Sequence, residues 1–177
     1  LHLCDQNLEH IDPEKITSTH NLLVDVLLGA QYEGKSLVEK YNEYKNTHDD
    51  FDSQICTALA RSFADIGDIV RGKDLYLGDR KEKVKLEEKL KQYFKQLHNI
   101  LKGGAKNHYG GDPDFFKLRE DWWEANRQEI WKAITCGVTD GDKYFRKTCS
   151  TGGHYEKCHC IGGDVLTNLD YVPQYLR

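Results

Sequence analysis

The sequence lacks any long hydrophobic run, and this absence excludes one class of structure. No apolar stretch approaches the roughly 20 residues that a helix needs to cross a bilayer. The opening residues, Leu1 to Cys4, lack the basic start and long apolar stretch of a signal peptide. We therefore expect any export signal or membrane anchor to lie outside residues 1–177.

Motifs of common catalytic sites are also missing. The sequence contains no glycine-rich phosphate loop, no H-E-x-x-H and no G-x-S-x-G. Its eight histidines are scattered, mostly through polar stretches, so a Cys–His nucleophilic pair would have to be assembled by the fold. The sequence predicts a protein that is not an enzyme and that needs no cofactor.

Aromatic residues, in contrast, are plentiful. They make up 11% of the 177 residues, which indicates one packed domain rather than a disordered tail. The net charge of −4 argues against nucleic acid as a partner of the whole chain.

Four segments show the apolar spacing of amphipathic helices. They span about residues 12–44, with Gly34 as a kink or break, 52–70, 80–102 and 112–137. Each is apolar on one side and must bury that side against the others. Residues 12–137 are therefore predicted to form an all-α helical bundle. The expected stripe residues are Ile16, Leu22, Leu23, Val26, Leu27 and Ala30; Ile55, Leu59, Phe63, Ile66 and Val70; Leu86, Leu90, Tyr93, Leu97 and Leu101; and Phe116, Trp123, Ile130 and Ile134, with Phe115, Leu118 and Trp122 widening the last.

The pattern changes after the fourth segment. Residues 138–170 hold three of the six cysteines, many glycines and no apolar period, so they are predicted to form a disulfide-tied loop region. Residues 171–177 resemble the start of another helix.

The six cysteines indicate an oxidising compartment. They are Cys4, Cys56, Cys136, Cys149, Cys158 and Cys160. An even number without a repeated C-x-x-C pattern favours a disulfide framework, although the sequence alone cannot fix the pairing.

Two readings of the cysteine cluster stay open. Cys149, His154, Cys158 and Cys160 could hold a zinc ion, but C-x-C is tighter than the usual ligand spacing. Disulfides are the favoured reading. Cys158 and Cys160 are too close to bond each other without strain, so each is expected to reach a separate partner.

Cys136 and Cys149 are the candidate partners for those two cysteines. Cys4 and Cys56 would then remain to pair with each other, which would tie the entry segment to the second helix.

The third helical segment is basic. Between Asp79 and Lys102 it carries eight basic and four acidic residues, a net charge of +4. Opposite its apolar stripe lie Lys81, Lys91, Lys95 and Lys102. Such a ridge can attract sulfated glycans. The alternative is a solvated helix face whose lysines pair with neighbouring glutamates.

Several blocks of sequence carry a family resemblance. Residues 60–75 (ARSFADIGDIVRGKDL) and 121–136 (DWWEANRQEIWKAITC) resemble the alpha class of Duffy-binding-like domains of the Plasmodium falciparum erythrocyte membrane protein adhesins. Residues 1–9 and 170–177 match the same class, so the similarity extends over the whole chain.

The resemblance implies a fold and a function. It implies a helical fold built in subdomains, with residues 1–11 ending the first, 12–170 forming the second, and most of the third missing. It also implies an extracellular adhesion module of a larger membrane protein on the infected erythrocyte, subject to antigenic variation.

Its implied partners are erythrocyte receptors, heparan sulfate-like glycans or blood-group sugars in rosetting and cytoadherence, and host antibodies. No ligand motif of the family transfers residue by residue. Arg61, Asp65 and Asp68 are expected to be internal ion pairs or exposed charges. A scaffold whose ligand site lies in missing subdomains, and a zinc-stabilised module, remain as alternatives.

Overall fold

A computed structural model describes residues 20–47, 55–75, 80–139, 144, 148–149, 157–160 and 162–177. These residues form the helices α2 (Asn21–Thr47), α3 (Ile55–Arg71), α4 (Arg80–Ile100), α5 (Gly103–His108) and α6 (Phe116–Ile134), followed by the 3-10 turns η2 (Leu169–Tyr171) and η3 (Gln174–Leu176). No strand occurs in these ranges, so the prediction of an all-α fold is confirmed for them.

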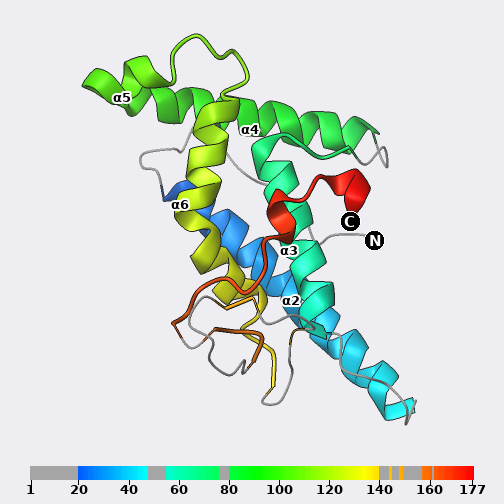
Figure 1. Ribbon diagram of the computed structural model, residues 1–177. Coiled ribbons are helices and arrows are strands. Elements are labelled where there is room, and N and C mark those ends of the chain that lie inside the picture. The colour runs from blue at the N-terminus through cyan, green and yellow to red at the C-terminus, as the bar shows by residue number, and fades with distance from the viewer. Residues whose placement is uncertain are drawn as a thin grey trace.

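Helices α2, α3 and α6 pack together, and α4 crosses one end of the bundle (Figure 1). Aromatic rings fill the space between α3 and α6. Phe63 lies 5.0 Å from Trp123 and 5.2 Å from Trp131, measured between ring centroids, and none of the three side chains reaches solvent. Burial of such large rings contributes strongly to the hydrophobic stabilisation of the bundle.

The predicted apolar stripes are largely confirmed. All five stripe residues of α3 are buried, as are four of the five predicted on α4; the fifth, Leu101, follows the end of that helix and is half-buried. On α6, however, Phe116 is 42% exposed, while Trp131 is fully buried outside the predicted stripe.

Gly34 neither breaks nor ends α2, which runs through it without interruption. The residue is buried where α2 crosses the end of α6. A Cβ atom on Gly34 would lie 1.9 Å from the carbonyl oxygen of Ile134, so only glycine permits this approach. The expected start of the helix at residues 12–19 lies outside the described residues.

Two element predictions differ from the structure. Helix α4 ends at Ile100, and the glycine pair Gly103 and Gly104 opens α5 instead of closing a helix. Residues 171–177 contain the end of η2 and all of η3 where the start of an α-helix was expected. Pro173, which separates the two turns, has no backbone N–H to continue a helical ladder.

The disulfide pairing corrects the sequence prediction in one respect. Cys160 bonds Cys149, which confirms one of the candidate pairings. Cys158 bonds Cys56, so the predicted pair of Cys4 and Cys56 is wrong. Cys136 is an exposed free thiol, and Cys4 lies outside the described residues.

The same bonds overturn the zinc hypothesis. Three of its four proposed ligands, Cys149, Cys158 and Cys160, are consumed by disulfides, while His154 lies outside the described residues.

The two disulfides are expected to contribute unequally to stability. Cys56 and Cys158 are 102 residues apart, whereas Cys149 and Cys160 are 11 apart. Chain entropy predicts about 4.7 kcal/mol for the long loop and about 2.8 kcal/mol for the short one. The double variant C56A/C158A should therefore lower the urea-derived free energy of unfolding by about 2 kcal/mol more than C149A/C160A. Equal losses would contradict this assignment.

Candidate interaction surface on helix α4

Helix α4 separates its side chains into a buried and an exposed face. Leu86, Leu90, Tyr93, Phe94 and Leu97 point into the core. The opposite side is exposed over the whole helix and just beyond it, and carries Lys81, Lys85, Glu88, Gln92, Lys95, Asn99 and Lys102. The first six recur every three or four positions along the helix, while Lys102 follows two residues after its end with an extended backbone. These seven residues are named the α4 ridge below.

Three of the four lysines predicted from the sequence lie on this ridge. Lys81, Lys95 and Lys102 are exposed. Lys91 is turned toward the loop before α6, where its Nζ lies 2.7 Å from Asp114 Oδ1. The hydrogen bond to Asp114 raises the pKa of the Lys91 ammonium, which is therefore committed to an ion pair.

Lys85 was missed by the sequence prediction, although it is exposed on the same ridge as Lys81. The signal was present, because the two residues are one helical turn apart. Four lysines, with Glu88 as the single acid, leave the α4 ridge net positive.

A buried arginine fixes α4 to the rest of the bundle. Arg119 of α6 is fully buried, and its Nη1 and Nη2 donate to the two carboxylate oxygens of Glu87 at 2.6 and 2.9 Å. Its Nε and Nη2 also donate to the carbonyl oxygens of Val70 and Ile69, at the end of α3. One guanidinium thereby joins three helices, and only its planar fork can reach all these acceptors at once.

Further contacts hold α4 at its start, in its middle and at its end. Near its start, Lys83 Nζ lies 3.1 Å from Asp74 Oδ2. In the middle, the hydroxyl of Tyr93 accepts a hydrogen bond from the backbone N–H of Leu22, the second residue of α2. At its end, His98 Nε2 lies 2.9 Å from the carbonyl oxygen of Lys106 and so connects α4 to α5. The ridge is therefore presented by a rigid helix.

A second polar network ties the C-terminal segment to α3 and α6. The buried carboxylate of Asp170 accepts hydrogen bonds from Trp123 Nε1 and from Nε and Nη2 of Arg127, each at 2.8 or 2.9 Å. Arg71 of α3, itself buried, donates to the carbonyl oxygen of Asp170. The ring of Tyr171 lies between these two arginines, 5.4 Å from the guanidinium carbon of Arg71 and 5.0 Å from that of Arg127.

The last residue belongs to the same segment. The guanidinium of Arg177 binds Asp65 and Asp68 of α3. Burial raises the pKa of both carboxyl groups, and the charge of Arg177 opposes that rise. Asp65 and Asp68 are thus internal ion-pair partners, as one of the two sequence readings had it, whereas Arg61 is exposed.

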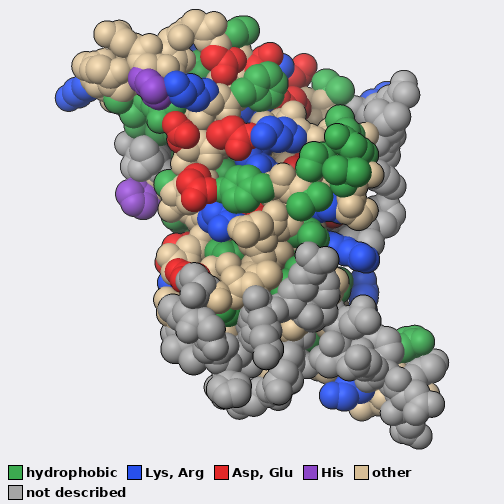
Figure 2. Space-filling view, viewed as in Figure 1, with side chains coloured by type: hydrophobic (Ala, Val, Ile, Leu, Met, Phe, Trp, Pro, Cys, Tyr) green, Lys and Arg blue, Asp and Glu red, His purple; other side chains and the backbone are tan. Residues whose placement is uncertain are grey.

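Acidic and basic side chains alternate over α6 and the C-terminal segment on the face shown in Figure 2. Lys73 and Glu120 form one ion pair between the end of α3 and α6. The α4 ridge differs from this face in carrying four lysines and one acid.

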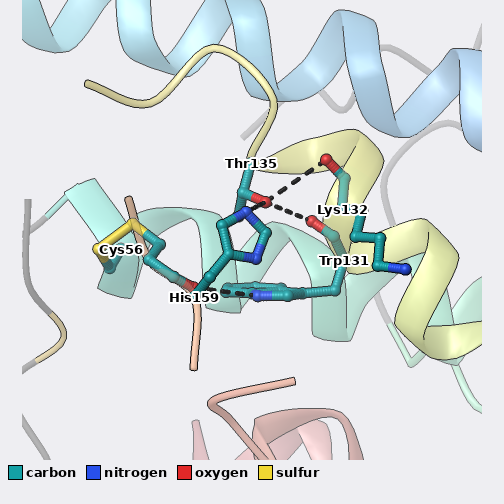
Figure 3. Close-up of a disulfide and its surroundings, with 6 residues drawn as sticks. Cys56, Trp131, Lys132, Thr135 and His159 are labelled. Atoms are coloured by element: carbon teal, nitrogen blue, oxygen red, sulfur yellow. Dashed lines mark hydrogen bonds between the residues drawn. A yellow bond between two sulfur atoms is a disulfide. The ribbon is translucent and has the colours of Figure 1, made fainter. Parts of the chain in front are cut away.

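His159 lies beside the disulfide that joins Cys56 to Cys158 (Figure 3). Its Nε2 is 2.9 Å from the hydroxyl of Thr135, which donates to the carbonyl oxygen of Trp131 at 2.7 Å. Burial, followed by the charge of Lys132, lowers the pKa of His159.

Sequence reasoning missed the buried charged residues, namely Arg119, which positions α4, and Arg71, Arg127 and Asp170, which position the C-terminal segment. Charged residues are usually exposed, so a helical pattern gives no signal that these are buried. Their only sequence mark is that Arg71, Arg127 and Asp170 fall within the blocks that carry the family resemblance.

Other kinds of site find no support in the described part of the chain. It contains no group of three or more His, Cys, Asp or Glu side chains that could hold a metal ion. None of its helices is long and apolar enough to span a membrane.

Replacing Arg119 by methionine should strongly destabilise the protein. The change removes the Arg119 donor from Glu87 and from the carbonyl oxygen of Val70. Because the side chain of Glu87 is 32% exposed, the expected loss is about 3 kcal/mol, the lower end of the range for a buried ion pair. Urea denaturation of Arg119→Met is the measurement, with Arg61→Met on the exposed side of α3 as its matched control. A loss for Arg119→Met no larger than that of the control would contradict the role given to Arg119.

His159 should make stability fall in mild acid. Because its pKa is lowered in the folded state, the unfolded chain takes up the proton first, and stability is lost as pH drops below about 6.5. The difference in unfolding free energy between wild type and His159→Gln should therefore change between about pH 7.5 and about pH 5.5. A difference that stays constant with pH would show that His159 does not titrate in this way.

Comparison with known proteins places this arrangement in a family. The chain matches the Duffy binding domain over residues 1–177. No curated protein matches it. Among solved structures, it is 43% identical, with a TM-score of 0.84, to the N-terminal NTS-DBL1-alpha and CIDR-gamma double domain of PfEMP1 from the Plasmodium falciparum varO strain, covering 99% of this chain and 25% of that one.

Two DBLbeta domains of PfEMP1 are also similar. An ICAM-1-binding domain is 34% identical, with a TM-score of 0.75, over 99% of this chain and 39% of its own. A domain bound to human ICAM-1 is 32% identical, with a TM-score of 0.66, over 83% of this chain and 33% of its own. This chain thus spans from a quarter to two-fifths of the solved chains. With its helices, disulfides and sequence all in agreement, the chain belongs to the Duffy binding domain family.

Proposed function

We propose that this chain is part of an adhesion domain that binds sulfated glycans on host erythrocytes through the α4 ridge, and that it is not an enzyme. The DBL domains of PfEMP1 are extracellular adhesion modules of a larger erythrocyte-surface protein. The similar DBLbeta domains bind ICAM-1, which supports a host-surface receptor as the class of partner.

The exposed lysines of the α4 ridge carry the proposal. Lys81, Lys85 and Lys95 lie along one side of a helix that is fixed at its start, middle and end, and Lys102 follows just after that helix. At about 1.5 Å per residue, the distance along the helix axis from Lys81 to Lys95 is roughly 21 Å. A straight row of positive charge of this length suits an extended polyanion better than a compact ligand.

Sulfated glycans are favoured over neutral blood-group sugars by the same argument. Lysine ammonium groups attract sulfates and release the counterions around them, which gives salt-dependent binding. Between the lysines, Gln92 and Asn99 offer amide groups for glycan hydroxyls. Rosetting, the binding of uninfected erythrocytes, would follow if the glycan lies on those cells.

The competing function is that of a scaffold for a site in the rest of the domain. The ion pair between Lys91 and Asp114 favours it, because one of the four predicted ligand lysines serves the fold instead.

Heparin-column retention against salt separates the two functions. The wild-type chain should be retained, and the triple variant Lys81→Glu, Lys95→Glu, Lys102→Glu should lose that retention. Lys35→Glu, Lys40→Glu, Lys45→Glu is the matched control, since it changes the same charge on exposed lysines of α2. It should elute much closer to wild type. Equal loss in both variants would show that heparin binding depends only on net charge and not on the α4 ridge. A wild-type chain that is not retained would favour the scaffold function.

A further inference from the structure

Positive charge is distributed unevenly along α4 and the segment that follows it. Residues 81–88 carry three lysines and three glutamates, whereas residues 89–111 carry five lysines and no acid. One of these five, Lys91, is neutralised by Asp114. Figure 2 shows Lys or Arg and His side chains over α5, at the upper left. The positive potential is therefore concentrated where α4 ends and α5 begins.

Lys106 of α5 adds a cation to this end of the α4 ridge. Its Nζ lies 3.4 Å from the carbonyl oxygen of Asn99, so the side chain turns back over the end of α4. Asn99 is itself a ridge residue, with Lys95 one helical turn before it and Lys102 just beyond the helix. The three lysines around Asn99, namely Lys95, Lys102 and Lys106, are named the α4–α5 corner below.

The ammonium groups of the corner are accessible to a ligand. All three lysines are exposed, and within the part of the chain that the structure describes none of them forms an ion pair. An ammonium has three donors, and the contact with Asn99 uses one of those of Lys106. The corner can therefore donate several hydrogen bonds to an anion without breaking an existing ion pair.

Polar contacts hold α5 in place, because the helix buries none of its residues. His98 Nε2 donates to the carbonyl oxygen of Lys106 at 2.9 Å, and the ring of His98 lies 5.6 Å from that of Phe115. The backbone of Lys106 is thereby fixed beside the end of α4.

The chemistry of α5 favours an anionic ligand over another protein surface. Its six residues are two glycines, an alanine, a lysine, an asparagine and a histidine. A protein segment packed over them would have to desolvate an ammonium group and would gain little buried apolar area in return. A sulfate group, in contrast, supplies the opposite charge that this surface lacks.

We propose that the α4–α5 corner is the subsite that anchors the glycan, where Lys95, Lys102 and Lys106 together hold one sulfated segment. This inference rests on the proposed function and narrows the site from the whole ridge to one end of it. Lysines act as point charges and lack the planar fork of arginine. The corner is therefore expected to recognise a high local density of sulfate groups rather than one fixed arrangement of them.

Titration calorimetry with a sulfated heparin tetrasaccharide tests the proposal on the 177-residue chain. The variant Lys95→Gln, Lys106→Gln removes two charges from the corner and should weaken binding about tenfold. The variant Lys81→Gln, Lys85→Gln removes two charges from the other end of the same ridge and is the matched control. It should weaken binding at most about twofold. Thermal melts by circular dichroism verify that both variants are folded.

Backbone amide shifts in NMR spectra locate the probe independently of any substitution. Addition of the tetrasaccharide should move the amide signals of residues 99–106 more than those of residues 81–88. The same tetrasaccharide without its sulfate groups should neither bind nor move them.

The possible failures separate this inference from the proposed function. Equal losses in the two double variants, or the largest shifts at the start of α4, would overturn the corner and leave the α4 ridge as a glycan site. A wild-type chain that is retained on heparin but does not bind the tetrasaccharide would have the same meaning. A chain that binds neither would overturn the proposed function as well.

Discussion

The fully buried guanidinium of Arg119 is the contact on which the arrangement of helices depends. A guanidinium carries its charge permanently, so it can be buried only if acceptors surround it. Glu87 and the last carbonyl groups of α3 provide them, and they come from two different helices. Desolvation of this ion therefore forces α3, α4 and α6 into one relative placement, and the exposed side of α4 is fixed as a consequence.

Buried charges that need partners also fix the position of the C-terminal segment. Asp170 is buried with its carboxylate held by Trp123 and Arg127, and Arg177 fills the space beside Asp65 and Asp68. Short 3-10 turns have little stability of their own. The order of residues 169–177 thus comes from ion pairs with α3 and α6, while the disulfide from Cys56 to Cys158 anchors the loop region to the start of α3.

A rigid interior of this kind leaves the exposed helix faces available for recognition. The α4 ridge is positive and polar, which suits a polyanion as its partner. Because substitutions on this ridge leave the buried ion pairs intact, the face can vary without loss of the fold.

The sequence by itself determined the helices and most of the core. Apolar residues at three- and four-residue spacing identified the stripes of α3 and α4, since that periodicity is a direct consequence of helix geometry. It also excluded a spanning helix and placed Lys81 and Lys95 on one exposed face of α4. Only the tertiary structure decided the partner of Cys56, the ion pair that removes Lys91 from the ridge, and the burial of Arg119 and Asp170. Those outcomes depend on which residues meet across the bundle, and local spacing carries no information about contacts between residues far apart in the chain.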